Sequence, residues 1–250
     1  MLIRLPPSES TANRRRGRPA APSTWSVPAL AATRERVAAA LVETSRSPDA
    51  ASLLGVSEGL LDEVARNLVL DTAPATPAAE VYTGVLYDAL DLPSLDTAAR
   101  RRANRWLVVV SALHGAVRPG DRITAYRLSM GATLPGLGPL AQVWRPALDR
   151  VLPEAAGRGV VVDCRSAAYA AAWRPDAALA SRWVQVRVPG ASHLAKHTRG
   201  LVARHLCESG VAARSVPALA DVVAGAFTTD LHEPARAGSP WVLDVVAPWV

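Results

Sequence analysis

The fold is set by Trp106-Leu-Val-Val-Val-Ser111, a nearly continuous apolar run. Such a run is typical of a β-strand that is covered on both faces. Similar runs predict strands over 2–5, 159–163, 183–188 and 241–246. Between them, helical patterns occupy 28–46, 57–69, 78–89, 95–104, 138–151, 166–172, 194–208 and 217–226. Strands interleaved with helices predict a mixed α/β (α+β) fold with a central sheet and covering helices.

The chain is long enough to bury a large core. It has 250 residues, half of them hydrophobic, and its Pro/Gly-rich joints include no long linker. We therefore predict a single compact domain over 1–250. Residues 28–70 are expected to form a helical subdomain. Residues 11–24, which contain Arg14, Arg15, Arg16 and Arg18, are expected to form a mobile basic loop.

Composition limits the partners and the compartment. The net charge is +6, but the four arginines of 11–24 leave only +2 on the rest of the chain. An anionic partner therefore requires that basic residues cluster. Cys164 and Cys207 indicate no disulfide framework, and no membrane span or secretion signal is present. We expect a cytoplasmic protein without a membrane partner, and no protein partner can be inferred.

One lysine, Lys196, stands among 28 lysines and arginines, within Ser192-His-Leu-Ala-Lys-His-Thr-Arg-Gly200. A high-GC coding bias explains the arginines but not the lysine. Lysine carries a compact ammonium that can lose its proton, whereas a guanidinium is permanently charged. Two interpretations stay open: a functional amine, or a lysine left on a solvated helix face.

A helical wheel over 192–208 predicts two faces. One face is expected to expose nitrogen-containing side chains, and we call it the face expected to present nitrogen. It contains His193, Lys196, His197, Gly200, Ala203, Arg204 and Cys207. The face expected to pack contains Leu194, Leu201, Val202 and Leu206. A glycine at position 200 lowers helix stability by about 1 kcal/mol relative to alanine. The loss is understandable if a phosphate, a base or another helix approaches the backbone closely there. His193 and His197 lack a neighbouring glutamate or cysteine pair, so we predict no metal site.

Polar residues follow several predicted strands, where a site on an open α/β sheet is expected. Ser8 and Glu9 follow the first strand, and Asp163 ends the strand 159–163. The loop after 106–111 contains Arg118, Asp121, Arg122, Tyr126 and Arg127. Each has a structural alternative, such as an ion pair of Asp121 with Arg118 or Arg127, or a helix cap for Asp163. If the strand ends converge on one edge, they form a pocket.

Common nucleotide and hydrolase motifs are missing from the sequence. There is no P-loop, no dinucleotide-binding glycine turn in a strand-turn-helix context, and no nucleophile elbow around Ser111 or Ser166. Nucleotide hydrolysis and serine hydrolase chemistry have no support, and we predict no cofactor.

Five motifs occur in a specific order over residues 1–210. They are Leu5-Pro-Pro-Ser-Glu9, Val81-Tyr-Thr-Gly-Val-Leu-Tyr87, Ser111-Ala-Leu-His-Gly115 through Arg118-Pro-Gly-Asp121 to Tyr126-Arg-Leu-Ser-Met130, Asp163-Cys-Arg-Ser-Ala-Ala-Tyr169, and Ala195-Lys-His-Thr-Arg-Gly200 with Arg204. In these motifs the chain resembles the YaaA peroxide-stress proteins.

The resemblance implies a single-domain α/β fold with a helix-hairpin-helix-like element near 53–66 and a positively charged cleft. It also implies DNA binding without sequence preference, protection of DNA and limitation of free iron during peroxide stress. The expected DNA- or ligand-binding residues are Ser8, Tyr82, Gly84, Arg118, Asp121, Tyr126, Arg127, Ser166, Tyr169, Lys196, His197, Arg199, Gly200 and Arg204. The chain departs from the family in having Ser10-Thr11 where a lysine is usual, and His193-Leu194 where a phenylalanine is usual.

These departures keep a second hypothesis open, an enzyme acting on a nucleobase, nucleotide or related small molecule as a lyase, hydrolase or glycosidase. Lys196 would then be the nucleophile or acid/base, Asp163 or Glu9 its carboxylate, and Arg127 an anion clamp. An enzyme predicts a closed pocket with Lys196 partly buried, whereas a DNA-binding protein predicts an open groove with Lys196 exposed. An iron-sequestering protein would need carboxylate and histidine clusters that the sequence lacks.

Overall fold

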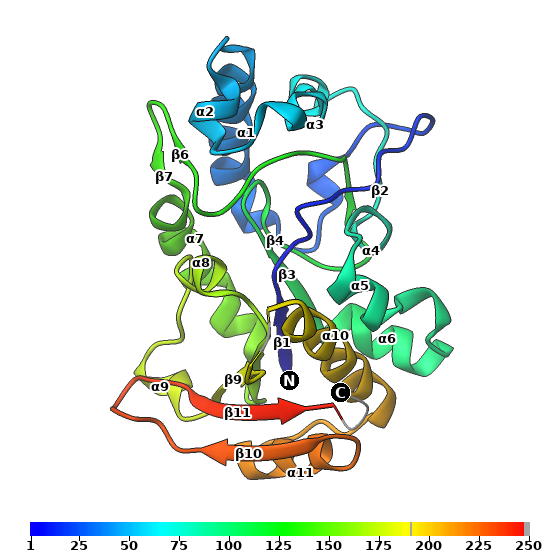
Figure 1. The fold of residues 1–250 in the computed structure, drawn as a ribbon, viewed down its shortest axis with the longest axis vertical. Helices are drawn as coiled ribbons and strands as arrows, with labels where there is room; N and C mark the ends of the chain where they lie inside the picture. The colour runs from blue at the N-terminus through cyan, green and yellow to red at the C-terminus, as the bar shows by residue number, and fades with distance from the viewer. Residues whose placement is uncertain (191, 248–250) are drawn as a thin grey trace.

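The computed structural model of the chain describes residues 1–190 and 192–247, with the backbone alone at Ser192 and His193. Its centre is a seven-stranded sheet (Figure 1). From edge to edge the sheet consists of β10 (Thr228–His232), β11 (Trp241–Val246), β9 (Trp183–Arg187), β8 (Val161–Asp163), β1 (Leu2–Leu5), β3 (Leu107–Ser111) and β4 (Gly115–Val117). The inner strands run parallel, whereas β10 and β4 are antiparallel to their neighbours.

The parallel strands are the ones that the apolar runs predict. β1, β3 and β8 are buried along their whole length, as expected of strands with helices on both faces. β4 and β10 are not predicted from the sequence. β4 is too short to show a pattern, and β10 reads Thr-Thr-Asp-Leu-His, which is mostly polar. The predicted mixed α/β class is confirmed.

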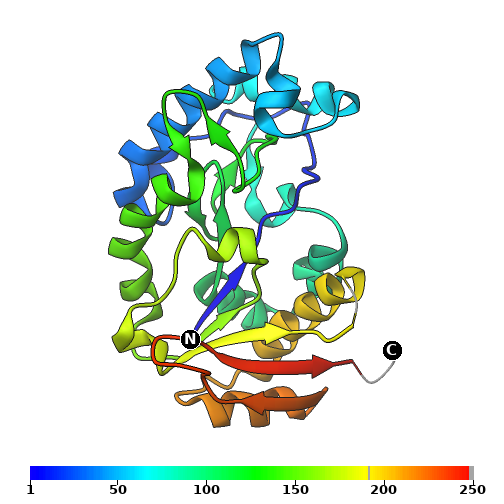
Figure 2. The ribbon, with the colours of Figure 1, turned by 60° about the vertical axis from the view of Figure 1, so that its left-hand side comes forward.

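Helices cover the sheet on both sides (Figure 2). α10 (Ser192–Ser209), α5 (Val85–Leu90) and α6 (Thr97–Trp106) pack together on one side. α7 (Leu140–Ala156) and α1 (Ala31–Arg46) lie on the other side, where α7 packs on β4. α11 (Val216–Ala224) packs against α10 and β10, at the side of the sheet that ends in β10. The covering helices that the sequence predicts are therefore present.

The predicted helical region 28–70 gathers at one end of the molecule, far from β10 and β11 (Figure 1). Only α1 is long. The predicted helix over 57–69 is broken into three short helices, and the sequence does not predict the short helix over 50–54. The elements are η2 (Pro28–Leu30), α1, α2 (Ala50–Leu54), η3 (Glu58–Leu60), α3 (Leu61–Ala65) and η4 (Arg66–Val69).

The predicted helix over 78–89 is interrupted at Gly84. Its two parts are α4 (Ala78–Val81) and α5, and Gly84 between them has φ 95°, in the region that favours glycine. This break points the chain at 82–84 towards the carboxyl end of β1. The remaining elements are α8 (Ala167–Ala170), α9 (Ala177–Ala180), η1 (Pro22–Thr24), η5 (Leu92–Ser94), β2 (Thr76–Pro77), β5 (Arg122–Ile123), β6 (Thr133–Leu134) and β7 (Gly138–Pro139).

The basic segment 11–24 runs along the surface and is attached at several points. Thr11 forms a β-bridge with Tyr82, and Pro19 forms one with Pro74. An exposed ion pair joins Arg14 to Glu80, with 2.8 Å between Nη2 and Oε2. These contacts give the segment one defined path, and its mobility stays a prediction.

The helical wheel of α10 is right at Val202 and Leu206, which are buried as expected, but wrong at four other positions. Gly200, Ala203 and Cys207 are buried, although the wheel places them on the face expected to present nitrogen. A Cβ on Gly200 would lie 2.2 Å from the Leu86 carbonyl oxygen. Leu194, expected to pack, is 39% exposed. The close approach at Gly200 is therefore that of α5, which the sequence periodicity alone could not locate.

Candidate functional site

The carboxyl ends of β1 and β8 open on the same edge of the sheet, because the two strands are parallel neighbours. A cavity of about 430 Å³ lies at this edge, and we call it the β1–β8 cavity. Its walls come from the chain after β1, the turn into α5, the chain after β8 and the first half of α10. The lining residues are Pro6, Pro7, Ser8, Glu9, Ser10, Thr83, Gly84, Val85, Leu86, Tyr87, Cys164, Ser166, Tyr169, Lys196 and Arg199.

Two side chains of the 83–87 turn hold the segment that follows β1. The Tyr87 hydroxyl donates a hydrogen bond of 2.6 Å to the Pro6 carbonyl oxygen. The Thr83 hydroxyl donates one of 3.2 Å to the Ser10 carbonyl oxygen. Because both bonds run to backbone atoms, the path of 6–10 is fixed, and with it the place of Ser8 and Glu9 at the cavity.

Two cations of α10 line the cavity without an acidic partner. Lys196 is exposed, and Arg199 is half-buried with its Nε donating to the Val186 carbonyl oxygen at 3.2 Å. Neither side chain forms an ion pair with any part of the chain that the structure describes. The exposure of Lys196 is what the DNA-binding hypothesis predicts, because phosphate groups need cations that protein carboxylates have not neutralised.

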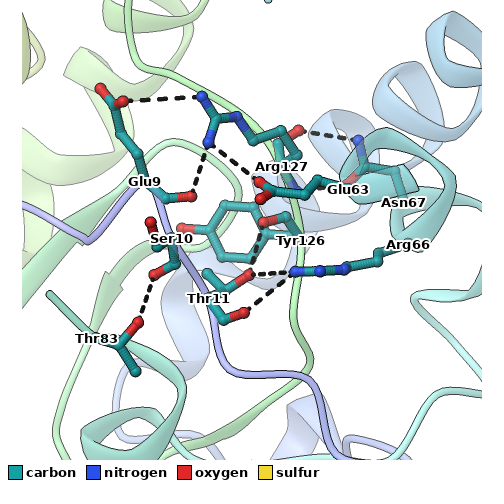
Figure 3. A network of polar contacts seen from close by, with 9 residues as sticks. All are labelled: Glu9, Ser10, Thr11, Glu63, Arg66, Asn67, Thr83, Tyr126 and Arg127. Atoms are coloured by element: carbon teal, nitrogen blue, oxygen red, sulfur yellow. Dashed lines mark hydrogen bonds and ion pairs between the residues drawn. The ribbon is translucent and has the colours of Figure 1, made fainter. Parts of the chain in front are cut away.

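Arg127 contacts Glu9 of the cavity lining and is already paired (Figure 3). Its Nη1 lies 3.2 Å from the Glu63 carboxylate, its Nη2 lies 3.8 Å from the Glu9 carboxylate, and Nη1 also donates to the Glu9 carbonyl oxygen at 3.0 Å. Arg127 thus ties the segment after β1 to α3. It is occupied by protein carboxylates, which argues against a free anion clamp.

The same network continues into the segment after Glu9 (Figure 3). The Asn67 side chain accepts a hydrogen bond of 2.8 Å from the Arg127 amide and donates one of 2.9 Å to the Arg127 carbonyl oxygen. Arg66 Nη1 donates to the Thr11 carbonyl oxygen at 3.1 Å, and the Thr11 hydroxyl donates to the Tyr126 carbonyl oxygen at 3.2 Å. The helical region 28–70 therefore positions one wall of the cavity.

Tyr82 and Tyr126 lie in the protein interior and do not line the cavity. Both are 2% exposed, and their hydroxyls lie 3.2 Å apart. The Tyr126 hydroxyl also forms a 2.8 Å hydrogen bond with the Ser111 hydroxyl. Burial raises the pKa of both tyrosines well above the usual range, so both stay neutral. These residues support the 83–87 turn from the protein interior.

Asp163 is a structural residue between two buried arginines. Its carboxylate accepts bonds from Arg4 at 2.8 Å, from Arg165 at 2.9 and 3.1 Å, and from the Trp183 indole at 3.2 Å. Burial alone would raise the pKa of the carboxyl, but the charges of Arg165 and Arg4 hold it well below its usual range. It does not line the cavity with Lys196, so its expected role as the partner of Lys196 is not supported.

Arg118 and Asp121 lie at the opposite edge of the sheet. β4 runs antiparallel to β3 and returns the chain to the start of β3, where Arg118 Nη1 donates to the Asn104 carbonyl oxygen at 3.3 Å. Asp121 Oδ2 accepts from the Arg118 amide at 2.8 Å, and its Oδ1 accepts from the Ser26 amide and hydroxyl. Asp121 thus fixes the loop through the Arg118 backbone amide, and not through the ion pair given as the structural alternative.

Three expected residues of α10 also fall outside the cavity lining. Gly200 is buried against α5, and Arg204 pairs with Asp91 and Glu208 at 3.6 and 2.9 Å. His197 is half-buried and does not line the cavity. The cavity therefore brings together seven of the expected residues: Ser8, Glu9, Gly84, Ser166, Tyr169, Lys196 and Arg199.

Sequence reasoning missed several residues of the cavity wall, among them Tyr87 and Cys164. Tyr87 belongs to a motif quoted above, but only its bond to Pro6 reveals its role. Cys164 directly follows β8 and is fully buried. Burial raises the pKa of its thiol to about 12, so the group is a neutral part of the wall. Its position one residue beyond a strand end was the available signal.

The structure also bears on metal binding and on membranes. Among the described residues, no three histidine, cysteine or acidic side chains are placed together to hold a metal ion. The pair His193 and His197 is not tested by this, because the His193 side chain lies outside the described part of the structure. Within 1–190 and 192–247, no helix is both long and apolar enough to cross a membrane.

The fold and the cavity define a mixed α/β protein whose basic site lies at the carboxyl ends of neighbouring parallel strands. Residues 1–231 match a family model described as "Peroxide stress protein YaaA". The chain belongs to this family.

Close relatives cover nearly the whole chain. A UPF0246 protein of Streptomyces coelicolor is 51% identical over 98% of this chain and 98% of its own length. Similar proteins of Corynebacterium efficiens and Corynebacterium glutamicum are 37% and 36% identical, covering 93% and 84% of this chain and 96% and 86% of their own lengths. The resemblance noted from the motifs is confirmed.

Proposed function

We propose that this chain is a cytoplasmic DNA-binding protein of the peroxide-stress response, which protects DNA and contributes to limiting free iron. The β1–β8 cavity is the centre of its DNA-binding surface. The observation that carries the proposal is the pair Lys196 and Arg199, which line the cavity from α10 and have no acidic partner among the described residues. Contacts from such cations to phosphate give affinity without sequence preference.

The hairpin of α2 and α3 is a second proposed contact. Gly55 ends α2 with φ 64° and begins the connection over 55–60 to α3, and a Cβ built there would meet no atom within 4 Å. The turn is therefore open to an approaching backbone. Amides at the start of a helix bind phosphate without reading bases, as in helix-hairpin-helix elements. Arg127, which pairs with Glu63 of α3 and donates to the Glu9 carbonyl oxygen, connects this hairpin to the cavity wall.

Fluorescence anisotropy with duplex, bubble and single-stranded DNA tests the proposal. We expect the wild type to bind in the micromolar range or tighter at low salt, and the double variant Lys196→Ala/Arg199→Ala to bind much more weakly. The matched control is Arg101→Ala/Arg158→Ala, which removes two exposed arginines outside the lining of the β1–β8 cavity. An absence of binding, or equal losses in both double variants, would contradict the proposal.

A second candidate is an enzyme that acts on a nucleobase, nucleotide or related small molecule. The favouring observation is the cavity volume of about 430 Å³, which is typical of small-molecule sites. Lys196 is the candidate nucleophile or acid/base there. Glu9 is the carboxylate available in the same lining, since both oxygens of Asp163 are engaged by arginines.

The variant Lys196→Arg separates the two functions. It keeps the positive charge but not an amine that can lose its proton. DNA binding is expected to survive this change. An enzyme would lose turnover, measured by incubating the protein with nucleosides and 5′-nucleotides and following products by mass spectrometry.

A further inference from the structure

A second cavity of about 410 Å³ lies on the other side of the segment that follows β8, and we call it the β8–β9 cavity. Its lining includes Asp163, Arg174, Trp183, Gln185, Arg236 and Ser239. Asp163 and Gln185 are register partners on β8 and β9, so their side chains share one face of the sheet. The turn before β11, which carries Arg236 and Ser239, lies over this face.

The cations of this cavity lack partners in the protein. Arg174 and Arg236 are exposed, and neither forms a hydrogen bond or ion pair through its side chain with a described residue. They lie 62 residues apart in sequence, yet both line one cavity. Two arginines that face one hollow repel each other unless an anion lies between them.

Asp163 does not neutralise this cavity, although its carboxylate is part of the lining. Both of its oxygens are taken by Arg4 and Arg165, which are 0% and 1% exposed. One carboxylate between two guanidinium groups leaves one excess positive charge. Nε and Nη1 of Arg4 are also buried without a hydrogen-bond partner. A buried charge that is incompletely paired is costly, and a nearby anion offsets part of that cost.

We propose that the β8–β9 cavity is a phosphate-binding site, with Arg174 and Arg236 as the two arms that hold the phosphate oxygens. The guanidinium fork matches phosphate geometry and binds it in a bidentate manner. Gln185 and Ser239 supply neutral donors from the wall, and the Trp183 ring supplies an apolar side.

The two cavities share a wall. Residues 163–170 line the β1–β8 cavity with Cys164, Ser166 and Tyr169, and the β8–β9 cavity with Asp163, Ala167 and Ala170. α8 is only four residues long, about 6 Å of helix rise. Phosphate groups of one chain of nucleotides therefore have room to reach both cavities across α8, and a free phosphorylated compound has room in either.

Titration calorimetry with inorganic pyrophosphate tests the site separately from DNA binding. The titration is made in the Lys196→Ala/Arg199→Ala background, so that the β1–β8 cavity does not contribute. We expect binding in this background, equal binding when Arg101→Ala/Arg158→Ala is added, and binding weakened by about tenfold or more when Arg174→Ala/Arg236→Ala is added. No binding in the background, or equal binding after loss of Arg174 and Arg236, overturns the proposal.

A second experiment, with DNA, distinguishes the source of the phosphate. Arg174→Ala/Arg236→Ala is introduced into the otherwise wild-type protein, and duplex binding is measured over a salt series. If the phosphate belongs to DNA, the slope of log K against log salt decreases by about 0.9, because the two arginines together hold one phosphate. If the slope is unchanged while pyrophosphate binding is lost, the ligand is a free phosphorylated compound.

Discussion

Gly200 of α10 lies against Leu86 of α5 at a distance that no other residue type allows. A Cβ built on Gly200 would stand 2.2 Å from the Leu86 carbonyl oxygen and 2.9 Å from the Ala89 Cβ. The two helices therefore touch through backbone. This contact sets Lys196 and Arg199 opposite the 83–87 turn, so the cavity depends on a glycine that does not line it.

Gly200→Ala should lower the free energy of unfolding by about 2 kcal/mol. Alanine gains about 1 kcal/mol of helix propensity, but the new methyl group must push two backbones apart, which costs more. Urea denaturation measures the change. The control is Gly59→Ala, where a Cβ meets no atom within 4 Å. A variant as stable as the control would show that α5 and α10 do not pack so closely.

Asp163→Asn should destabilise the fold by about 3 kcal/mol, because it leaves the buried Arg4 and Arg165 without a counter-charge. The measurement is thermal and urea unfolding, with the exposed Asp62→Asn as the control, expected to change the free energy by less than about 0.5 kcal/mol. If Asp163→Asn unfolds like the wild type, the aspartate is not the structural centre that its bonds indicate.

His114 should make the protein less stable in mild acid. Its side chain is 5% exposed, and burial, with a smaller effect from the Arg34 charge, lowers its pKa to about 3. The unfolded imidazole binds a proton below pH 6.5, whereas the folded one does so only near 3. Stability is therefore full above pH 6.5 and is lost as the pH falls from 6.5 towards 3.

The expected slope from this single group approaches about 1.4 kcal/mol per pH unit. His114→Phe keeps the aromatic contacts with Trp25 and Tyr126 but cannot titrate. Its free energy of unfolding, measured at several pH values from 4 to 7, should depend less on pH than that of the wild type. Parallel curves for the two proteins would mean that the folded imidazole takes up its proton normally.

Arg127→Gln should loosen the segment after β1. The ion pair with Glu63 is largely shielded, with side chains 16% and 24% exposed, so we expect a loss of about 1 kcal/mol. Hydrogen exchange at the Ala12 amide, which donates to the Val81 carbonyl oxygen at 2.9 Å, should become faster. Glu43→Gln, which breaks an ion pair with 64% and 77% exposed partners, is the control and should change nothing measurable. Unchanged exchange in Arg127→Gln would show that other contacts hold the segment.

The sequence predicts the buried half of the architecture well. The parallel strands were found because strands covered on both faces carry almost nothing but apolar side chains. β10 was not found, since an edge strand with exposed positions reads as a polar loop. α10 was placed correctly along the chain, but its packing surface extends beyond the predicted face to Gly200, Ala203 and Cys207, because a helical wheel does not show where a neighbouring helix approaches.

The candidate site was predicted in part for a similar reason. Ser8 and Ser166 follow neighbouring parallel strands, whose ends must lie on one edge, so their convergence could be expected. Arg118 and Asp121 also follow a strand, but β4 is antiparallel and carries them to the opposite edge. The reversal depends on β4, and a strand of three residues is too short for a hydrophobic pattern to reveal.

The most direct test of the proposed function compares Lys196→Ala with Lys196→Arg in duplex DNA binding over a salt series. We predict that the wild type binds with log K falling linearly against log salt. Lys196→Ala should weaken binding and reduce the slope by about 0.9, and Lys196→Arg should retain both affinity and slope. Equal binding by Lys196→Ala and the wild type, or no binding by the wild type at low salt, would contradict the account.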